Sequence, residues 1–368
     1  MMMMSPIRTW VSVGLVAALP ALGADQAPPA SKVDWASIAD LIVNRSWKLS
    51  PGERAVLFWD RSADRGAVGA VRKAILAKGG LVAGEIDVAD PPDAAAWARL
   101  FGAADVAIWF PTRSLPERPF EHLVEGSKVR SIHFHWFVPP DTALVDGIDA
   151  MYAKAIAVPP AELLARQSTL ASALAGAKVR LTSPNGTALS FEVPAGARFH
   201  RNTGDASRAK VADARSVRDR QEELPASVVR TTELRHVEGT LVGYATFDAS
   251  GPVLRATFKG GQAVKLASLR GAEEIVTRWE QATGDKAAPA ELVISTNPAL
   301  ERTLPGGFMP YYGYGAGIVR VTIGDNWESG GKNRSALGET LFFLSDATLE
   351  ANGKALVRDG RLVSRQGR

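Results

Sequence analysis

The sequence predicts an N-terminal α/β domain over residues 34–175 and a C-terminal β-rich α+β domain over residues 176–368. In the first half, short apolar runs alternate with helical patterns, which is typical of a Rossmann-like layer with a parallel sheet. In the second half, short strands separated by turn signals dominate. With 368 residues, 46% of them hydrophobic and 22% charged, the chain has the length and composition of a two-domain folded protein.

The elements of the first half follow one another with clear start and stop signals. Asp34 is placed to cap a helix that runs through residue 42. Gly79 and Gly80 end the second helix. Strands are expected over 55–59, 81–86, 105–110 and 131–138, and further helices over 67–78, 92–101 and 159–175.

The second half begins with a predicted hairpin over residues 179–193, whose Asn185-Gly186 pair favours a tight turn. Further strands are expected over 239–247, 254–258 and 263–266, followed by a helix over 271–283 and a C-terminal set of strands. The chain therefore changes from alternating strands and helices to a mainly antiparallel sheet near Gly176.

The N-terminus has the features of a signal peptide, assigned to residues 1–24, followed by a linker over 25–33. Arg8 precedes an apolar run over 10–22, and small residues precede a polar, Pro-containing stretch. The run is too short for an ordinary membrane-spanning helix, although an uncleaved anchor is the alternative. We expect a periplasmic or secreted protein without membrane contact after cleavage. The chain contains no cysteine, which excludes disulfides and thiolate metal sites.

The charge distribution argues against a nucleic-acid partner. The 43 basic and 39 acidic residues give a net charge of +4. The most basic segment, residues 201–220, is interrupted by Asp205, Asp213 and Asp219. It is therefore interpreted as a solvated loop or helix face and not as a nucleic-acid groove.

Three segments of the second half resemble a known enzyme family. They are LTSPNGTALSFEV over 181–193, ELVISTNP over 291–298 and GGKNRSAL over 330–337. In this order they resemble the thermophilic-type metallo-aminopeptidases, the aminopeptidase T and aminopeptidase S family. The resemblance spans about residues 38–363 and is looser in the first half. It implies a homodimer that uses two zinc or cobalt ions to remove N-terminal residues from peptides.

Most positions that match the metal ligands of this family hold other residue types. Glu291 keeps a ligand carboxylate, whereas Arg320 stands at the position of a histidine. The remaining ligand positions match Val228, Tyr312, Gly313, Gly338 and Thr340. Arginine stays charged and does not bind zinc, so a Glu291–Arg320 ion pair is expected in place of a metal. Strand alternation predicts that Glu339 points away from this site, unless the register slips.

Several other residues are candidates for ligand contacts. Tyr312 and Tyr314 lie in a Gly- and Tyr-rich segment over 305–317 that either lines a pocket or forms a mobile loop. Asn333 belongs to the GGKNRSAL segment. His236 follows the segment in which Val228 stands at a ligand position, so it is expected to approach the site of Glu291.

His133 and His135 lie two residues apart in a predicted strand and therefore share a face. Such a pair either chelates a metal or forms hydrogen bonds in an ordinary strand. The sequence suggests no third ligand nearby, which favours the structural interpretation.

Two functions from different classes remain. The first is an exported aminopeptidase-like protein with a degenerate metal site, centred on Glu291 and Arg320, that binds a peptide or small molecule without a metal cofactor. The alternative is an active aminopeptidase that holds two zinc or cobalt ions with relocated ligands. The first is favoured because a metal site needs its full ligand set.

Overall fold

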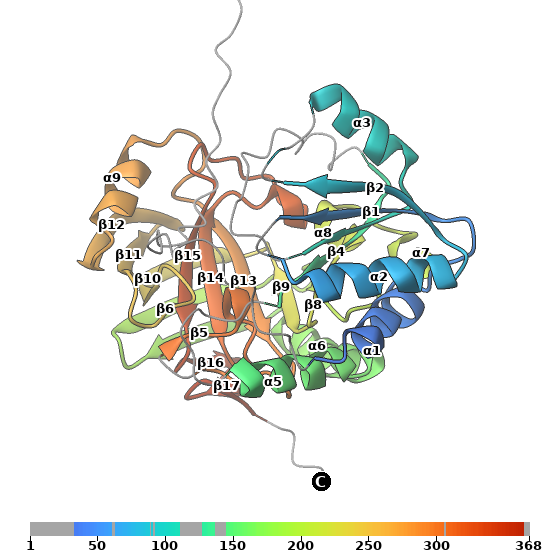
Figure 1. Ribbon diagram of the computed structural model, residues 1–368. Coiled ribbons are helices and arrows are strands. Elements are labelled where there is room, and N and C mark those ends of the chain that lie inside the picture. Colours follow the sequence, from blue (N-terminus) through green and yellow to red (C-terminus); the bar gives the residue numbers. More distant parts are fainter. Residues whose placement is uncertain are drawn as a thin grey trace, which may run out of the picture.

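The chain forms two sheets that lie side by side (Figure 1). The computed structural model describes residues 33–60, 63–88, 90, 93–110, 127–136, 145–304 and 307–363. The predicted signal peptide and nearly all of the predicted linker lie outside these residues. Sheet A is parallel and five-stranded, and sheet B is antiparallel, 13-stranded and strongly curled. The structure thus confirms a mixed α/β protein with a parallel layer and a β-rich layer.

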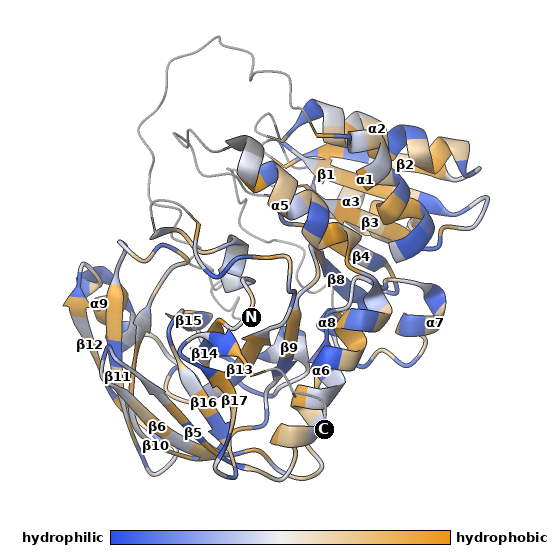
Figure 2. Ribbon diagram, turned by 90° about the horizontal axis from the view of Figure 1, so that it is seen from below, coloured by the Kyte–Doolittle hydropathy of each residue, from blue (hydrophilic) through white to orange (hydrophobic). Residues whose placement is uncertain are grey.

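Sheet A has the strand order β2-β1-β3-β4-β8 and helices on both faces. Alternate residues of β1 point to opposite sides, so Leu57 packs in the cluster under α1 and α2, while Phe58 stacks on Trp97 of α3. Figure 2 shows apolar colour along these strands, as expected for a sheet covered on both faces. The elements are β1 (Arg54–Trp59), β2 (Leu81–Asp87), β3 (Val106–Trp109), β4 (Arg130–Phe134), β8 (Gln221–Leu224), α1 (Trp35–Asp40), α2 (Arg65–Ala77) and α3 (Ala94–Ala103).

Local signals in the sequence start the helices of this half. The carboxylate of Asp34 accepts a hydrogen bond from the Ser37 amide at 3.1 Å, and Asp93 caps α3 in the same way. The first helix continues as a π-helical turn, Leu41–Ser46. Two further helices, α5 (Val145–Ala157) and α6 (Pro160–Leu174), lead to sheet B. Helix α6 begins with Pro160, at a position where a backbone amide has no partner within the helix, so the missing amide hydrogen of proline loses no hydrogen bond.

The strand β8 joins sheet A although it follows the first strands of sheet B in the sequence. It pairs in parallel with β4, with His133 opposite Glu223. The buried carboxylate of Glu222 holds β8 in this position, because it accepts hydrogen bonds from the backbone amides of Thr203 and Gly204 at 2.9 and 2.7 Å. The sequence pattern predicts that residues 221–224 belong to the second domain, whereas the structure pairs them with β4 of sheet A. In the structure, the short link from β8 to β9 connects the two sheets directly.

Sheet B has the order β18-β17-β16-β5-β6-β10-β15-β14-β13-β9-β7, with β11 and β12 attached through β10. Its concave side encloses an apolar cluster that includes Leu181, Leu292 and Phe342. The predicted hairpin is confirmed as β5 and β6, and Gly186 in its turn has a φ of +101°.

The strands of sheet B are β5 (Lys178–Ser183), β6 (Thr187–Glu192), β7 (His200–Arg201), β9 (Val228–Thr231), β10 (Arg235–Tyr244), β11 (Val253–Lys259), β12 (Gln262–Arg270), β13 (Pro289–Ser295), β14 (Val319–Gly324), β15 (Glu339–Leu344), β16 (Thr348–Ala351), β17 (Lys354–Arg358) and β18 (Arg361–Leu362). The helical segments are α7 (Arg208–Val211), α8 (Val217–Arg220), α9 (Glu273–Gln281), η3 (Tyr311–Gly313) and η4 (Trp327–Ser329). Of these, α9 covers β12 at the outer end of the sheet.

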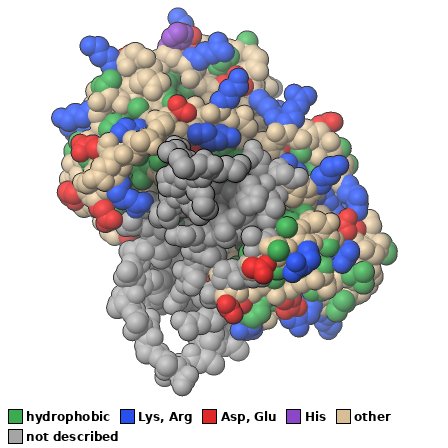
Figure 3. All heavy atoms as spheres, turned by 90° about the horizontal axis from the view of Figure 1, so that it is seen from above, with side chains coloured by type: hydrophobic (Ala, Val, Ile, Leu, Met, Phe, Trp, Pro, Cys, Tyr) green, Lys and Arg blue, Asp and Glu red, His purple; other side chains and the backbone are tan. Residues whose placement is uncertain are grey.

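On the face drawn in Figure 3, basic and acidic side chains of the described residues are interspersed and not separated by sign. Among the helices that the structure describes, none combines the length and the apolar character needed to span a membrane.

Candidate functional site

Four neighbouring strands of sheet B present charged side chains on one face. The register places Arg230 of β9, Val293 of β13, Arg320 of β14 and Phe343 of β15 in one row across the sheet. Glu291 lies two residues before Val293 and therefore shares this face. The face looks away from the apolar interior of sheet B, which contains the alternate residues of the same strands.

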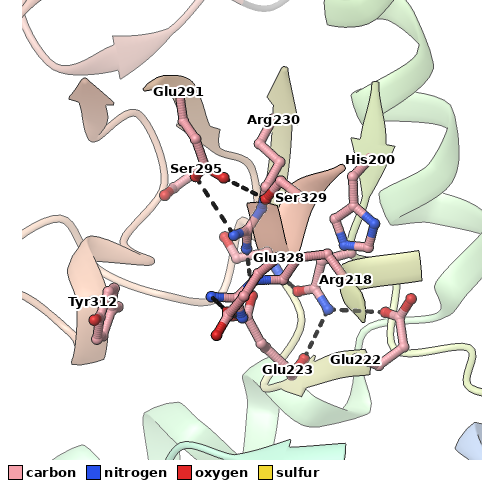
Figure 4. A network of polar contacts seen from close by, with 12 residues as sticks. His200, Arg218, Glu222, Glu223, Arg230, Glu291, Ser295, Tyr312, Glu328 and Ser329 are labelled. Carbon is pink, nitrogen blue, oxygen red and sulfur yellow. Dashed lines mark hydrogen bonds and ion pairs between the residues drawn. The ribbon is translucent and has the colours of Figure 1, made fainter. Parts of the chain in front are cut away.

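Glu291 lies between two guanidinium groups. Its Oε2 is 3.8 Å from Nη1 of Arg230 and 3.8 Å from Nη2 of Arg320. Its Oε1 accepts a short hydrogen bond from the hydroxyl of Ser329 (Figure 4). All three charged side chains are almost completely buried. The sequence predicts Arg320 alone beside Glu291, whereas the structure adds Arg230 as a second cation.

The ion pairs continue from Arg230 toward sheet A. Glu223 of β8 lies 2.8 Å from Arg230 and 3.0 Å from Arg218 of α8. Arg218 also lies 2.8 Å from Glu328 of η4. Burial opposes the ionisation of Glu223, but the guanidinium groups of Arg230 and Arg218 outweigh it and hold the pKa of this carboxyl well below its usual range. The result is an alternating charge cluster, defined by Glu328, Arg218, Glu223, Arg230, Glu291 and Arg320, of which all but Arg320 are labelled in Figure 4.

Glu339 belongs to this face, which corrects the prediction that it points away. The β14–β15 register pairs Gly324 with Glu339 and Arg320 with Phe343, so Glu339 and Phe343 share one side of β15. The pairing of β15 with β14, and not the spacing of the family motif, decides on which face of β15 the Glu339 side chain lies. Glu339 keeps some solvent exposure, yet burial, followed by the charge of Glu291, raises its pKa to about 8.

The predicted tyrosines lie beside the charge cluster. Arg320 is 5.0 Å from the ring centre of Tyr312, and its Nη1 donates to the Tyr312 carbonyl at 3.4 Å. Tyr314 is buried, and burial together with the charge of Glu223 raises its pKa well above the usual range. Residues 305–306 of the same segment lie outside the described residues.

His133 of β4 and His135, which follows this strand, approach the cluster from sheet A. The rings of His133 and His135 are 5.9 Å apart, and the ring of His135 is 5.9 Å from that of Tyr314. Burial lowers the pKa of His135 to about 4, which keeps its imidazole neutral. Across the described ranges, no group of three His, Asp or Glu side chains is arranged to hold a metal ion.

A cleft of about 330 Å³ lies next to the cluster. Asn333 lines it and donates from its side chain to the Pro289 carbonyl at 2.9 Å. His236, by contrast, is exposed at the start of β10, with a φ of +52°, and is not part of the lining. The remaining lining residues are Arg198, His200, Asp219, Arg230, Thr231, Thr232, Glu233, Asn326, Ser329, Gly330, Gly331 and Lys332.

The side chains around Glu291 do not fit a pair of metal ions. A two-metal site needs several carboxylate and imidazole donors around both ions. Here Glu291 is balanced by two arginines, and Val228, which the resemblance places at another ligand position, lies opposite Ser295 on the neighbouring strand. Arginine has no lone pair to offer a metal at any ordinary pH.

The sequence contained a signal for only part of this cluster. Arg230 follows Val228 by two residues, so strand alternation alone would have placed it on the ligand face. Arg218 lies in the segment interpreted as a solvated basic loop, and its side chain is in fact only 15% exposed. Glu223 lies on β8 and Glu328 on η4, about a hundred residues apart in the sequence, and no local pattern indicates that both contact Arg218.

No protein-family model and no curated protein matches the sequence of this chain. Among solved structures, it is similar to the wild-type aminopeptidase AmpT of Thermus thermophilus, with a TM-score of 0.62 and 16% identity over 90% of this chain and 99% of that chain. The fold is aminopeptidase-like. The chain is also similar to 2,5-dihydroxypyridine dioxygenase of Pseudomonas putida KT2440, with a TM-score of 0.65 and 16% identity over 92% and 99% of the two chains. Proteins with different reactions thus share this fold, so the chemistry depends on the site residues.

Proposed function

We propose that this protein is an exported, aminopeptidase-like protein that binds a peptide or small molecule at a site where arginine side chains replace the metal ions. The observation that carries the proposal is the position of the Glu291 carboxylate, 3.8 Å from both Arg230 and Arg320. A guanidinium group neutralises a carboxylate as a metal ion would, but it does not activate a bound water for hydrolysis.

The cluster also has polar atoms available for a ligand. Within the described part of the chain, Oε2 of Glu291, Nε of Arg230, Nε of Arg320 and Oγ1 of Thr322 are buried without a hydrogen-bond partner. Each such atom costs about 1–3 kcal/mol when it stays unpaired. A ligand with both an amino and a carboxylate group, such as an amino acid or a short peptide, has complementary hydrogen-bonding groups for both the carboxylate and the guanidinium groups.

The metal content of the protein tests the proposal. We expect no stoichiometric zinc, cobalt or manganese in purified protein after mild dialysis, because Arg230 and Arg320 occupy the surroundings of Glu291. Elemental analysis measures this directly, and hydrolysis of aminoacyl anilides with and without added zinc or cobalt serves as the functional control. One or two tightly bound ions per chain, together with metal-dependent hydrolysis, would establish the metallo-aminopeptidase alternative.

Export is a separate part of the proposal. We expect the mature chain to start near Ala24 or Asp25, because small residues precede this point and a polar stretch follows it. N-terminal sequencing of protein from the periplasmic fraction is the measurement. A chain that still begins at residue 1 and sediments with the membranes would contradict export by a cleaved signal.

A further inference from the structure

The cleft beside the charge cluster has a volume of about 330 Å³, at the lower end of the range for small-molecule sites. It lies between the edge strand β7, the strand β9 and the loop that follows η4. Arg230 lines the cleft and lies 3.8 Å from Glu291, so the cleft adjoins the charge cluster at this side chain.

Three cationic and two anionic side chains line the cleft. Its cationic side chains are Arg198, Arg230 and Lys332, and its carboxylates are Asp219 and Glu233. Asp219 binds the guanidinium of Arg198, and Glu233 accepts a hydrogen bond from the backbone amide of Arg198. Arg198 and Arg230 are themselves paired with carboxylates, so the cleft offers an oxyanion the ammonium group of Lys332 and the guanidinium N–H groups not used in those pairs.

The Asp219 carboxylate accepts hydrogen bonds from the backbone amides of Arg215 and Ser216, each at 2.9 Å, at the start of α8. It also binds the guanidinium of Arg198. Glu233 accepts the backbone amide of Arg198 at 2.7 Å. These interactions fix the backbone around the cleft, pair Asp219 with Arg198 and use one oxygen of Glu233.

The remaining polar groups of the cleft are neutral. Burial lowers the pKa of His200 to about 4, against the opposing effect of Asp219, whose Oδ1 is 3.7 Å from Nδ1 of His200. Arg230, Lys210 and Glu223 are the other charged groups that act on this imidazole. A neutral histidine is suited to hydrogen-bond an oxygen atom of a ligand without changing the charge of the cleft near neutral pH.

We propose that this cleft binds the oxyanion group of a small molecule, a carboxylate or a phosphate, through Arg198, Arg230 and Lys332. Arg230 supplies a buried guanidinium whose Nε has no hydrogen-bond partner among the described residues, and Lys332 supplies an exposed ammonium group. Asn326 and Asn333 hold the loop between them, since the Asn326 side chain accepts the Asn333 amide at 2.9 Å. The proposal extends the proposed function, with which it shares Arg230, and it does not depend on the absence of metal at Glu291.

Isothermal titration calorimetry at constant ionic strength tests the cleft on the full mature chain. The probes are inorganic phosphate and N-acetyl-alanyl-alanine, whose blocked amine leaves the carboxylate as its only charge. The corresponding amide, N-acetyl-alanyl-alanine amide, is the uncharged control probe. We expect saturable binding of at least one oxyanion probe and none of the amide, and the preferred probe identifies phosphate or carboxylate as the natural group.

Two variants assign the binding to this cleft. Lys332→Gln and Arg198→Gln are each expected to weaken binding by roughly tenfold, the effect of losing one charge-assisted contact. Lys354→Gln removes an exposed lysine of β17 outside the cleft and is expected to leave the affinity unchanged. Thermal unfolding of each variant verifies that it is folded.

Two results would overturn the proposal: neither oxyanion probe binds, or Lys332→Gln and Lys354→Gln weaken binding equally, as a diffuse charge effect would. The metal analysis stays independent of this test. If the protein contains metal and still binds the anion through Lys332, the proposed function is wrong and the proposal of an anion-binding cleft stands.

Discussion

Neutralising Glu291 or Arg320 is expected to lower the melting temperature by several degrees, and neutralising both is expected to recover part of the loss. The two charges are buried and 3.8 Å apart. Removal of one leaves the other without its partner, which costs up to about 3–5 kcal/mol in a buried pair. In Glu291→Gln both Arg230 and Arg320 lose a counter-charge, whereas in Arg320→Met the carboxylate still has Arg230. We therefore expect Glu291→Gln to cost more.

Thermal unfolding of the two single variants and of the double variant gives the coupling directly. Arg358→Met is the matched control, since it removes an arginine from an exposed position on β17. Strictly additive losses would show that Glu291 and Arg320 do not interact. Arg320 would then be assigned to an anionic ligand and not to the ion pair with Glu291.

Replacing Glu339 with glutamine is expected to make the protein more stable at alkaline pH and less sensitive to pH. Its carboxyl has a pKa of about 8 in the folded chain, compared with 4.5 for an unperturbed glutamate, because of burial and the charge of Glu291. The folded protein therefore holds this proton more tightly than the unfolded chain. The stability contribution of Glu339 is unaffected below about pH 4.5 and falls as the pH rises toward 8. Glu339→Gln removes this loss.

The measurement is the melting temperature between pH 5 and pH 9 for the wild type, Glu339→Gln and Glu301→Gln. The last variant removes the same charge from an exposed position and controls for the change in net charge. We expect the curve of Glu339→Gln to be flatter than the other two. Parallel curves for all three proteins would show that Glu339 titrates in the folded chain as it does in the unfolded one.

The sequence by itself determined the local elements and the coarse class of the fold. Asp34 and Asp93 start helices through hydrogen bonds to residues three positions away, and the Asn185-Gly186 turn closes a hairpin between neighbouring strands. Such interactions join residues close in the sequence, so short sequence motifs predict them. The change from a parallel to an antiparallel sheet is likewise visible in how strands and helices alternate.

Only the tertiary structure decided which charges meet. The pairing of β8 with β4 brings Glu223 beside Arg230, and the β14–β15 register brings Glu339 to the face of Arg320. Both depend on contacts between segments distant in the sequence, where a shift of one residue reverses the face of every side chain. The charge of Glu291 can be read from the sequence, but the guanidinium groups that surround it come from strands that only the fold places side by side.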